Sequence, residues 1–474
     1  METLQRTANR GSISTGYDID NSLKIESDNS ESLNRTLGTV TDVDKATFSF
    51  WFKRTELGRQ WLFSTRQNTS SPYDTFRISM TADDEIQVQN YQTSYNARIV
   101  TNRLFRDTSA WYHIVASIDT TQSTAGDRIR LYINGVEETS FSTEDQPPQN
   151  SDLYLESGRI LEIGRFIPDQ GLAGALYECE GYLAEAHFVD GQQLAPTEFG
   201  EFDEDSGIWK PKEYTGTYGN NGHYLKFDSS GSLGADSSGN GNDFTLNNIA
   251  AADQATDSPT NNFSTMNPLW TNSFTTYTEG ATNVDTTGSG WMSMVSTFAV
   301  SKGKWYWEFK RDSGNAFVGI VDTEEQYIPR STAGYFFGYN DDSSTNSIGL
   351  YSANGQVYNS PGGSPDAAGF TTSNIVGVAV DMDNRRLYYS IDGTYAGSMD
   401  PAGGSGGVTI PSNWNSEHIY MGFSGFNGSY AVNFGGYTTI SISSAANDGE
   451  YGNFEYAPPS GYYALCSKRL AEYG

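Results

Sequence analysis

Two stretches of this chain, far apart in the sequence, repeat one pattern. In residues 111–135 and again in residues 374–393, an apolar run that ends in aspartate is followed by a polar reversal and a Tyr-bearing run. The second run ends in Asn134-Gly135 in one copy and in Asp392-Gly393 in the other. Asn-Gly and Asp-Gly readily adopt the positive φ angles of tight hairpin turns. Each copy therefore predicts three antiparallel strands in the middle of a β-sheet, and the chain is predicted to contain two related β-sandwiches.

The length and the composition fit two all-β domains. A chain of 474 residues exceeds the size at which one hydrophobic core keeps growing. Its 50 glycines, 30 tyrosines and 25 phenylalanines, beside only 18% charged residues, are typical of an aromatic, turn-rich all-β protein. The predicted fold is two antiparallel, jelly-roll-like β-sandwiches in tandem. We assign residues 1–16 to an N-terminal arm, 17–249 to the first sandwich, 250–268 to a linker and 269–474 to the second sandwich.

The formal net charge of −29 restricts the partners that this chain is expected to have. It repels phosphate backbones and anionic membrane surfaces, so neither nucleic acid nor a membrane is an expected partner. No apolar run reaches the roughly 18 residues of a membrane span, and residues 1–7 lack the apolar core of a signal peptide. We expect synthesis in a cytoplasm without a secretion signal, although the composition resembles that of an extracellular binding protein. Release by cell lysis accounts for both.

The four histidines form no catalytic or metal-binding pattern. His113 and His187 lie inside predicted strands, where a lone histidine is usually packed or hydrogen-bonded, and no second ligand stands at metal spacing. His223 and His418 lie next to turns. No Ser-His-Asp order stands out, and no Gly-rich phosphate loop follows a strand. The sequence therefore predicts that this protein is not an enzyme.

Residues 290–465 resemble the SPRY family. The motifs that carry the resemblance are Gly303-Lys304-Trp305-Tyr306-Trp307-Glu308, Val318-Gly319-Ile320, Gly377-Val378-Ala379-Val380-Asp381, Leu387-Tyr388-Tyr389-Ser390-Ile391-Asp392-Gly393 and Val432-Asn433-Phe434-Gly435. The first domain resembles a laminin-G-like member of the concanavalin A-like lectin/glucanase superfamily. Its motifs are Phe48-Ser49-Phe50-Trp51, Trp111-Tyr112-His113-Ile114-Val115, Leu131-Tyr132-Ile133-Asn134-Gly135 and residues 181–191.

The junction between the domains, from residues 208–214 to residues 257–263, resembles the connector in two-domain proteins of tailed bacteriophages. This resemblance implies a virion structural protein, assembled in the host cytoplasm and placed at the virion surface. Such a protein needs no signal peptide, because the host lyses. The expected partners are other virion proteins of the capsid or tail and a host surface glycan, and a homo-oligomer is a further option.

The lectin superfamily also contains glucanases, so their chemistry has to be considered. Their catalytic strand carries Glu-x-Asp-x-x-Glu, which puts the two working carboxylates on one face. No such pattern occurs in this chain. The nearest run, Glu201-Phe202-Asp203-Glu204-Asp205, lacks the terminal glutamate and is expected to be a solvated loop.

The resemblance to lectin-like sandwiches implies a calcium site as one option. Such sandwiches often hold Ca²⁺ with Asp and Asn oxygens at a sheet rim. Asp236, Asn240, Asn242 and Asp243 offer these oxygens, although Asn/Asp/Gly clusters also serve turns for their own sake. No other cofactor is expected.

The same families bind through aromatic and polar loops. An aromatic ring stacks on the C–H face of a sugar, and neighbouring polar groups take its hydroxyls. The candidate contact residues for a carbohydrate or protein partner are Tyr73, Tyr91 and Tyr95 in the first domain, and Trp270, Trp291, Tyr335, Tyr358 and Trp414 in the second. The alternative for each is a ring that only covers the sandwich edge.

Three functions follow from these observations. The first is a structural protein of the phage surface, either a capsid decoration or a tail or appendage component, which contacts proteins or host glycans. The second is a carbohydrate-binding adhesin that recognises the receptor, as a tail-fibre knob does. A polysaccharide depolymerase is the least favoured, because the paired carboxylates are missing.

Overall fold

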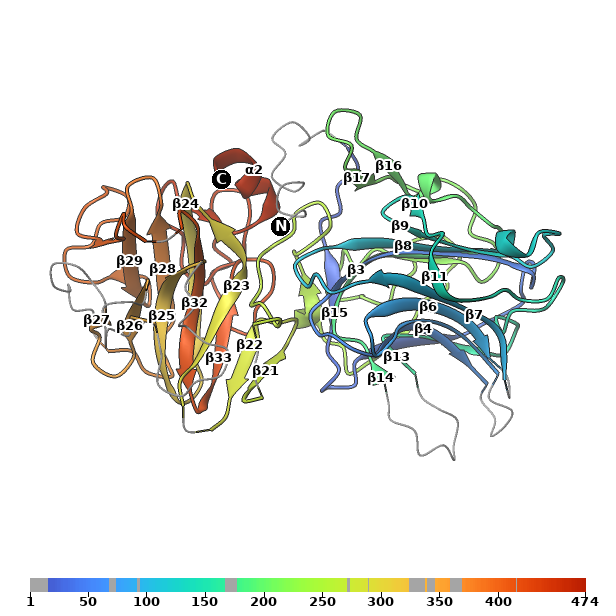
Figure 1. Ribbon diagram of the computed structural model, residues 1–474, viewed down its shortest axis with the longest axis horizontal. Coiled ribbons are helices and arrows are strands. Elements are labelled where there is room, and N and C mark those ends of the chain that lie inside the picture. The colour runs from blue at the N-terminus through green and yellow to red at the C-terminus, as the bar shows by residue number, and fades with distance from the viewer. Residues whose placement is uncertain are drawn as a thin grey trace. The chain divides into compact units, whose positions relative to one another are not determined.

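The structure is a computed structural model that describes residues 16–67, 74–91, 94–166, 177–270, 273–288, 290–323, 337–338, 346–358, 369–414 and 416–474. The chain forms two compact units, one ending at Thr260 and one beginning at Asn261 (Figure 1). This boundary lies inside the segment expected as a linker, residues 250–268. Within the described residues, α2 (Ser467–Tyr473) is the only α-helix, and the prediction of an all-β chain built from antiparallel sheets is confirmed.

The first unit contains two large sheets. Sheet A has the strand order β10 (Val136–Glu137), β9 (Ile129–Ile133), β8 (Tyr112–Asp119), β3 (Lys45–Arg54), β15 (Gly181–Asp190), β1 (Ser22–Ile25) and β20 (Gln254–Ala255), and β18 (His223–Leu225) also pairs with β15. Strand β20 lies within residues 250–268, so the first part of that segment belongs to the first sandwich and does not link the units.

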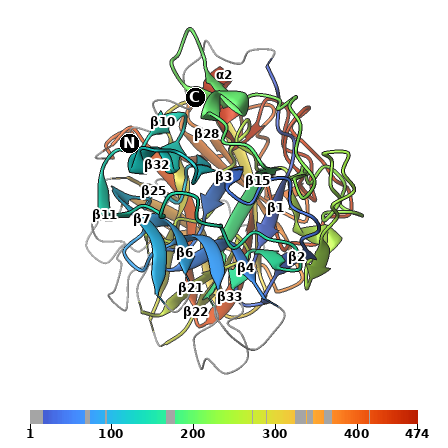
Figure 2. The same ribbon diagram turned by 90° about the vertical axis from the view of Figure 1, so that its right-hand side faces the viewer.

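Sheet B has the order β11 (Phe141–Asp145), β7 (Tyr95–Leu104), β6 (Glu85–Tyr91), β5 (Thr75–Met80), β4 (Gln60–Arg66), β12 (Ile160–Ile163), β2 (Ser32–Thr36) and β19 (Thr245–Asn247). Figure 2 shows β7, β6, β4 and β2 in this order across the sheet. Two short pairs complete the unit: β13 (Arg165–Phe166) with β14 (Tyr177–Glu178), and β16 (Gly200–Phe202) with β17 (Trp209–Pro211). The core lies between the sheets, where Phe48 of β3 stacks on Phe76 of β5.

The second unit repeats this two-sheet plan. Sheet C has the order β21 (Thr275–Thr278), β22 (Asn283–Thr286), β33 (Gly428–Asn433), β24 (Lys304–Arg311), β28 (Val376–Asp381), β29 (Arg386–Ile391) and β30 (Thr394–Tyr395), with β31 (Val408–Thr409) beside β29 and β34 (Tyr463–Ala464) parallel to β24. Sheet D has the order β23 (Met292–Val300), β32 (Ile419–Phe426), β25 (Asn315–Asp322), β26 (Ser347–Tyr351) and β27 (Val357–Tyr358).

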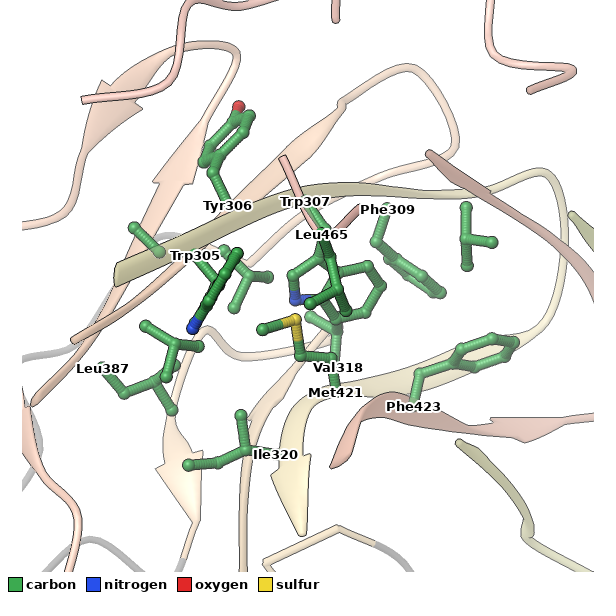
Figure 3. Close-up of a cluster of buried hydrophobic side chains, with 14 of the residues drawn as sticks. Trp305, Tyr306, Trp307, Phe309, Val318, Ile320, Leu387, Met421, Phe423 and Leu465 are labelled. Carbon is green, nitrogen blue, oxygen red and sulfur yellow. The ribbon is translucent and has the colours of Figure 1, made fainter. Parts of the chain in front are cut away.

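Alternation along β24 explains how this core forms. Trp305, Trp307 and Phe309 point toward Val318 of β25 and Met421 of β32, whereas the intervening Tyr306 points the other way (Figure 3). The period of two that the sequence shows at residues 304–309 is thus the period of burial.

The duplicated pattern forms the same substructure twice. Strands β8, β9 and β10 of sheet A and strands β28, β29 and β30 of sheet C are antiparallel neighbours. Asn134 and Asp392 have φ of 49° and 48° in the connecting turns, and the glycine after each also has a positive φ. The predicted place in the sheet was wrong, because both sets lie at a sheet edge. Each set lies at an edge because its last strand, β10 or β30, has only two residues and no further strand follows it in the sheet order.

Candidate functional site

The outer face of sheet A is covered by the chain itself. Residues 196–221, here called the covering segment, include η2 (Pro196–Glu198), β16 and β17. Three of its rings, those of Phe199, Tyr214 and Tyr218, form an apolar cluster with Val189 of β15. The run expected as a solvated acidic loop lies here; it begins inside β16, and the Asp203 carboxylate accepts hydrogen bonds from the hydroxyl and backbone N–H of Ser206.

His113 of β8 is fixed beneath this segment. The Trp209 indole N–H donates to His113 Nδ1 at 3.0 Å, and His113 Nε2 lies 2.9 Å from the Ser49 hydroxyl. Because an indole nitrogen only donates, Nδ1 is the acceptor and the proton of the neutral ring is on Nε2. His113 therefore donates to Ser49 and cannot take its proton, so this buried pair is not a nucleophile and base. Burial lowers the pKa of His113 to about 3, which keeps the ring neutral.

His187 and His223 are also packed. His187 Nδ1 lies 2.9 Å from the Tyr218 hydroxyl, and its ring stacks on Tyr224 with centroids 4.2 Å apart. His223 lies on the core side of β18, opposite Phe188, and in the described residues neither of its ring nitrogens has a hydrogen-bond partner. Burial lowers the pKa of His223 to about 3. The prediction that the strand histidines His113 and His187 are packed or hydrogen-bonded is confirmed.

A buried ion pair joins the end of the first unit to sheet A. Lys53 Nζ of β3 lies 2.7 Å from Asp257 Oδ2, and both side chains are almost completely buried. The indole N–H of Trp111 donates to the other oxygen of Asp257 at 3.1 Å. These contacts and the covering segment occupy the outer face of β3, β8 and β15 with the protein's own groups.

The outer face of sheet B is different, because a row of polar side chains crosses six of its strands. The strand register aligns Arg98 of β7, Gln89 of β6, Arg77 of β5, Ser64 of β4, Glu162 of β12 and Asn34 of β2. Directly opposite residues of antiparallel strands point to the same face. Their sequence neighbours Phe76, Ile78, Val88 and Ile99 belong to the core, so the row points away from it. We call these six residues the arginine row.

Arg77 lies at the centre of the row among aromatic rings. Its guanidinium carbon is 4.1 Å from the ring centroid of Phe166, 4.8 Å from that of Trp61 and 5.5 Å from that of Tyr91. Cation–π contacts of this kind hold a guanidinium in one orientation. Burial lowers the pKa of Arg77 to about 10, so the group stays charged at neutral pH.

Several polar atoms beside Arg77 have no partner in the described residues. These are the side-chain oxygens of Gln87 and Gln89 and the Nε of Arg98, all of them buried atoms. Both carboxylate oxygens of Glu162, in contrast, have a hydrogen-bond donor. One accepts from Arg66 at 3.0 Å and the other from Arg165 at 3.2 Å. The row therefore contains donors and acceptors that its own side chains leave unused.

Two of the predicted contact residues lie at one end of this row. Tyr91 ends β6 and Tyr95 begins β7, and their ring centroids are 5.1 Å apart. Tyr95 is 51% exposed, and its ring lies 5.0 Å from the Arg98 guanidinium. Tyr73, the third candidate in this domain, lies outside the described residues.

The four residues proposed for calcium organise a loop. The Asp236 carboxylate accepts backbone N–H groups of Tyr224, Ser238 and Asn242, and Asp243 accepts the backbone N–H of Asp236. The amide groups of Asn240 and Asn242 both donate to the carbonyl of Gly222. In the described part of the chain, no group of three or more His, Cys, Asp and Glu side chains is arranged to hold a metal. The calcium site stays a prediction.

The outer face of sheet D carries a cluster of rings, five of them half-buried around the buried Phe317, which we call the aromatic face. Its members are Trp270, Trp291, Phe317, Tyr351, Tyr358 and Tyr420. Phe317 stacks on Tyr351 with centroids 4.4 Å apart, and Trp291 meets Phe317 edge-on at 4.8 Å. The structure thus brings together three of the predicted contact residues of the second domain, Trp270, Trp291 and Tyr358.

The remaining predicted residues of the second domain do not join the aromatic face. The prediction that Trp414 contacts a partner is corrected, because this residue is only 8% exposed and belongs to the core between sheets C and D. This ring therefore packs within the fold, which is close to the alternative weighed for it, a ring that only covers the sandwich. Tyr335 lies outside the described residues.

No membrane-spanning helix is found among the helices that the structure describes.

The arginine row contains signals that sequence reasoning missed. Arg77 and Ser79 alternate with apolar residues in β5, and Gln87 and Gln89 do so in β6, so the outward position of each could be read from the period of two. The alignment of Arg77 with Gln89 depends on the register between β5 and β6, which cannot be read from a local sequence pattern. Of the residues in and beside the row, the sequence analysis proposed only Tyr91 and Tyr95, because they are aromatic.

Comparison with known proteins places the first unit in a fold. Residues 22–178 match a family model described as the concanavalin A-like lectin/glucanases superfamily, and this range contains the whole arginine row. No curated protein matches the chain.

Among solved structures, the chain is similar to the SPRY domain of human HERC1, with 11% identity, a TM-score of 0.24 and coverage of 32% of this chain and 89% of that one. It is also similar to a native heptameric SAP-like pentraxin from Limulus polyphemus, with 16% identity, a TM-score of 0.27 and coverage of 38% and 80%. The TRIM65 PSpry domain gives 14% identity, a TM-score of 0.26 and coverage of 36% and 90%. Residues 22–178 of the first unit are thus similar to the concanavalin A-like lectin/glucanase superfamily, in agreement with the two-sheet sandwich that the structure shows.

Proposed function

We propose that this chain is a non-catalytic binding protein of a tailed-phage surface, and that its first unit binds a polysaccharide on the arginine row. The observation that carries this proposal is the set of unpartnered polar atoms beside Arg77. A buried acceptor without a partner costs about 1–3 kcal/mol, and such groups in native structures call for an explanation. Sugar hydroxyls that donate to Gln87 and Gln89 would remove this cost in the complex.

The aromatic end of the row supports a sugar ligand. Tyr95 is half exposed and lies next to Tyr91, so a ring face is available beside the polar groups. Sugar-binding sites combine these two features, a stacking ring and a few fixed polar groups. The match of residues 22–178 to a lectin and glucanase superfamily model agrees with a glycan ligand.

The carboxylates of the row support binding without hydrolysis. A retaining glycosidase needs two carboxyl groups about 5–5.5 Å apart, and an inverting one needs them about 6.5–9.5 Å apart. The row contains one carboxylate, Glu162, and two arginines hold both of its oxygens. Incubation with a bound polysaccharide is therefore expected to release no reducing ends.

The second unit supplies a surface for a protein partner. Five half-buried rings gather around the buried Phe317, and an apolar face of this kind can hold a protein. We propose that this aromatic face contacts another protein of the capsid or tail. Mass spectrometry of washed phage particles is expected to find the chain in stoichiometric copies, and its absence from them would remove the virion assignment while leaving the glycan assignment intact.

Affinity electrophoresis of the full chain tests the glycan assignment. Gels that contain neutral or acidic polysaccharides are expected to retard the wild-type chain with at least one polysaccharide. The double variant Gln87→Ala/Gln89→Ala is expected to lose at least tenfold in affinity, whereas Gln149→Ala, an exposed glutamine outside the row, is expected to bind normally. Failure of every polysaccharide to retard the wild-type chain would contradict the proposal.

A further inference from the structure

The charge of the arginine row is opposite to that of the chain. The chain has 58 acidic and 29 basic residues, so a surface chosen at random is acidic. The row contains Arg77 and Arg98 and the single carboxylate of Glu162. Because Glu162 is bonded to Arg66 and Arg165, its charge is already balanced by groups beside the row. Asp145 of β11 lies directly opposite Arg98 in the register, so the positive charge that no neighbouring carboxylate offsets is that of Arg77.

Neither Arg77 nor Arg98 is held by an acidic side chain in the described residues, although Asp145 of β11 lies opposite Arg98 in the register. Within the described residues neither forms an ion pair, and the Nε of Arg98 is buried without a hydrogen bond. A desolvated charge without a counter-charge destabilises the folded state unless another group compensates. The rings of Trp61 and Phe166 compensate in part through cation–π contacts. In the described residues, the one hydrogen bond of the guanidinium is that of its Nε–H to the Thr75 hydroxyl, at 3.2 Å.

We infer that the arginine row selects acidic polysaccharides, whose carboxylate or sulfate groups pair with Arg77 and Arg98. This inference rests on the proposed function and names its ligand class. Arginine binds carboxylate and sulfate-like oxyanions through two parallel N–H bonds, which gives direction as well as charge. The amide groups of Gln87 and Gln89 then take the hydroxyls, and the exposed ring of Tyr95 stacks on a sugar face.

The spacing of the two arginines requires a polymeric ligand. Gln89 separates them in the register, so they lie two strand spacings apart, about 9–10 Å. A single acidic group is too small to meet both guanidinium groups. A chain with several acidic groups can reach both, so galacturonic acid as a monomer is expected to compete poorly with a polyuronate.

Four ligands used with the full chain test the inference. The ligands are alginate, which carries carboxylates, dextran sulfate, which carries sulfates, neutral dextran and neutral laminarin. Alginate, dextran sulfate or both are expected to bind, more weakly in 0.5 M than in 0.1 M NaCl, because salt screens the ion pairs. Binding to alginate alone or to dextran sulfate alone supports the inference and identifies the anionic group.

Variants decide whether the row is responsible. Arg77→Gln and Arg98→Gln are each expected to lower the affinity for the bound acidic polysaccharide at least tenfold. Arg130→Gln, on β9 of sheet A, makes the same change in net charge and is expected to leave the affinity unchanged. Arg77→Lys, which keeps the charge but not the paired geometry, is expected to fall between the two. Thermal unfolding of each variant shows whether it is folded.

The outcomes separate this inference from the proposed function. Binding of dextran or laminarin without alginate or dextran sulfate would overturn the inference and leave a glycan-binding protein. Acidic binding that Arg77→Gln and Arg98→Gln, both folded, do not reduce would also overturn it. If none of the four ligands binds but another neutral polysaccharide does, the inference fails while the proposed function stands. If no polysaccharide binds at all, both fail.

Discussion

The outer faces of the two sheets of the first sandwich have very different surroundings. The face of sheet A is filled by the covering segment, whose Trp209 and Tyr218 hydrogen-bond the two strand histidines. The face of sheet B has the arginine row, where Gln89 and Arg98, together with the neighbouring Gln87, leave buried atoms without a hydrogen-bond partner in the described residues. Both faces are rich in aromatic and polar groups. These two histidines and the buried ion pair of sheet A have partners from the protein itself, whereas buried amide oxygens of sheet B do not, and the proposed function rests on this difference.

The comparison predicts that changes on sheet A affect stability and that changes on sheet B affect binding. The largest expected effect is that of Asp257→Asn, which leaves the buried Lys53 ammonium without its counter-charge. Loss of one partner of a buried pair costs about 3–5 kcal/mol. Urea unfolding is expected to show this loss, while the folded variant binds polysaccharide with wild-type affinity. A large loss of affinity in the folded variant would break the division between the two faces. The double variant Lys53→Met/Asp257→Leu is the control, and it is expected to regain most of the stability.

The second effect is a dependence of stability on pH that comes from His113. Burial lowers its folded-state pKa to about 3, below the unfolded value of about 6.5, so the unfolded chain binds more protons between these values. The protonation of His113 therefore does not lower the stability of the folded chain above pH 6.5, and it lowers this stability progressively as the pH falls toward 3. His113→Gln, whose amide can accept from Trp209 and donate to Ser49, is expected to reduce the loss of stability between pH 8 and 4.5 by about 3 kcal/mol. An unchanged pH profile in urea unfolding would mean that His113 titrates normally.

The third effect is of the opposite kind, a gain in stability with a loss of binding. Gln89 is 1% exposed, and its side-chain oxygen has no partner in the described residues. Gln89→Leu removes a buried unsatisfied acceptor and is expected to stabilise the chain by about 1 kcal/mol. Affinity for the bound polysaccharide is expected to fall. A destabilised variant that binds normally would show that Gln89 serves the fold and not the ligand.

The smallest effect is expected for Tyr95→Ala. Because the ring is 51% exposed, its removal is expected to change the free energy of unfolding by less than about 0.5 kcal/mol. Loss of ring stacking is expected to weaken polysaccharide binding by about 0.5–1.5 kcal/mol. Isothermal titration calorimetry measures the change, with Tyr132→Ala on sheet A as the matched control. Equal effects of the two variants would argue against a specific role for Tyr95.

The elements of this fold were largely readable from the sequence. The period of two predicted β3 from residues 46–54 and β24 from residues 304–309, and the Asn-Gly and Asp-Gly turns predicted both hairpins. These features are local, since each depends on side chains a few residues apart. The position of the hairpins at a sheet edge could not be predicted locally, because it depends on which strands from distant parts of the sequence pair beside them.

The candidate sites show the same limit. Tyr91, Tyr95, Trp270, Trp291 and Tyr358 were proposed as contact residues because aromatic residues stand out in a sequence, and their role stays a prediction. Arg77 and Gln89 were missed, since their meaning arises only when β5 and β6 pair in register. Trp414 was misplaced because the same residue type serves cores and surfaces, and only the path of the chain after β31 decides between them.

Hydroxyl-radical footprinting tests the central claim most directly, because rings report on every surface in one experiment. With an acidic polysaccharide bound to the full chain, oxidation of Tyr91 and Tyr95 is expected to fall, while oxidation of Trp291 and Tyr351 on the aromatic face stays unchanged. Protection of the aromatic face without protection of Tyr91 and Tyr95 would contradict the account, since the ligand would then occupy the second unit and not the arginine row.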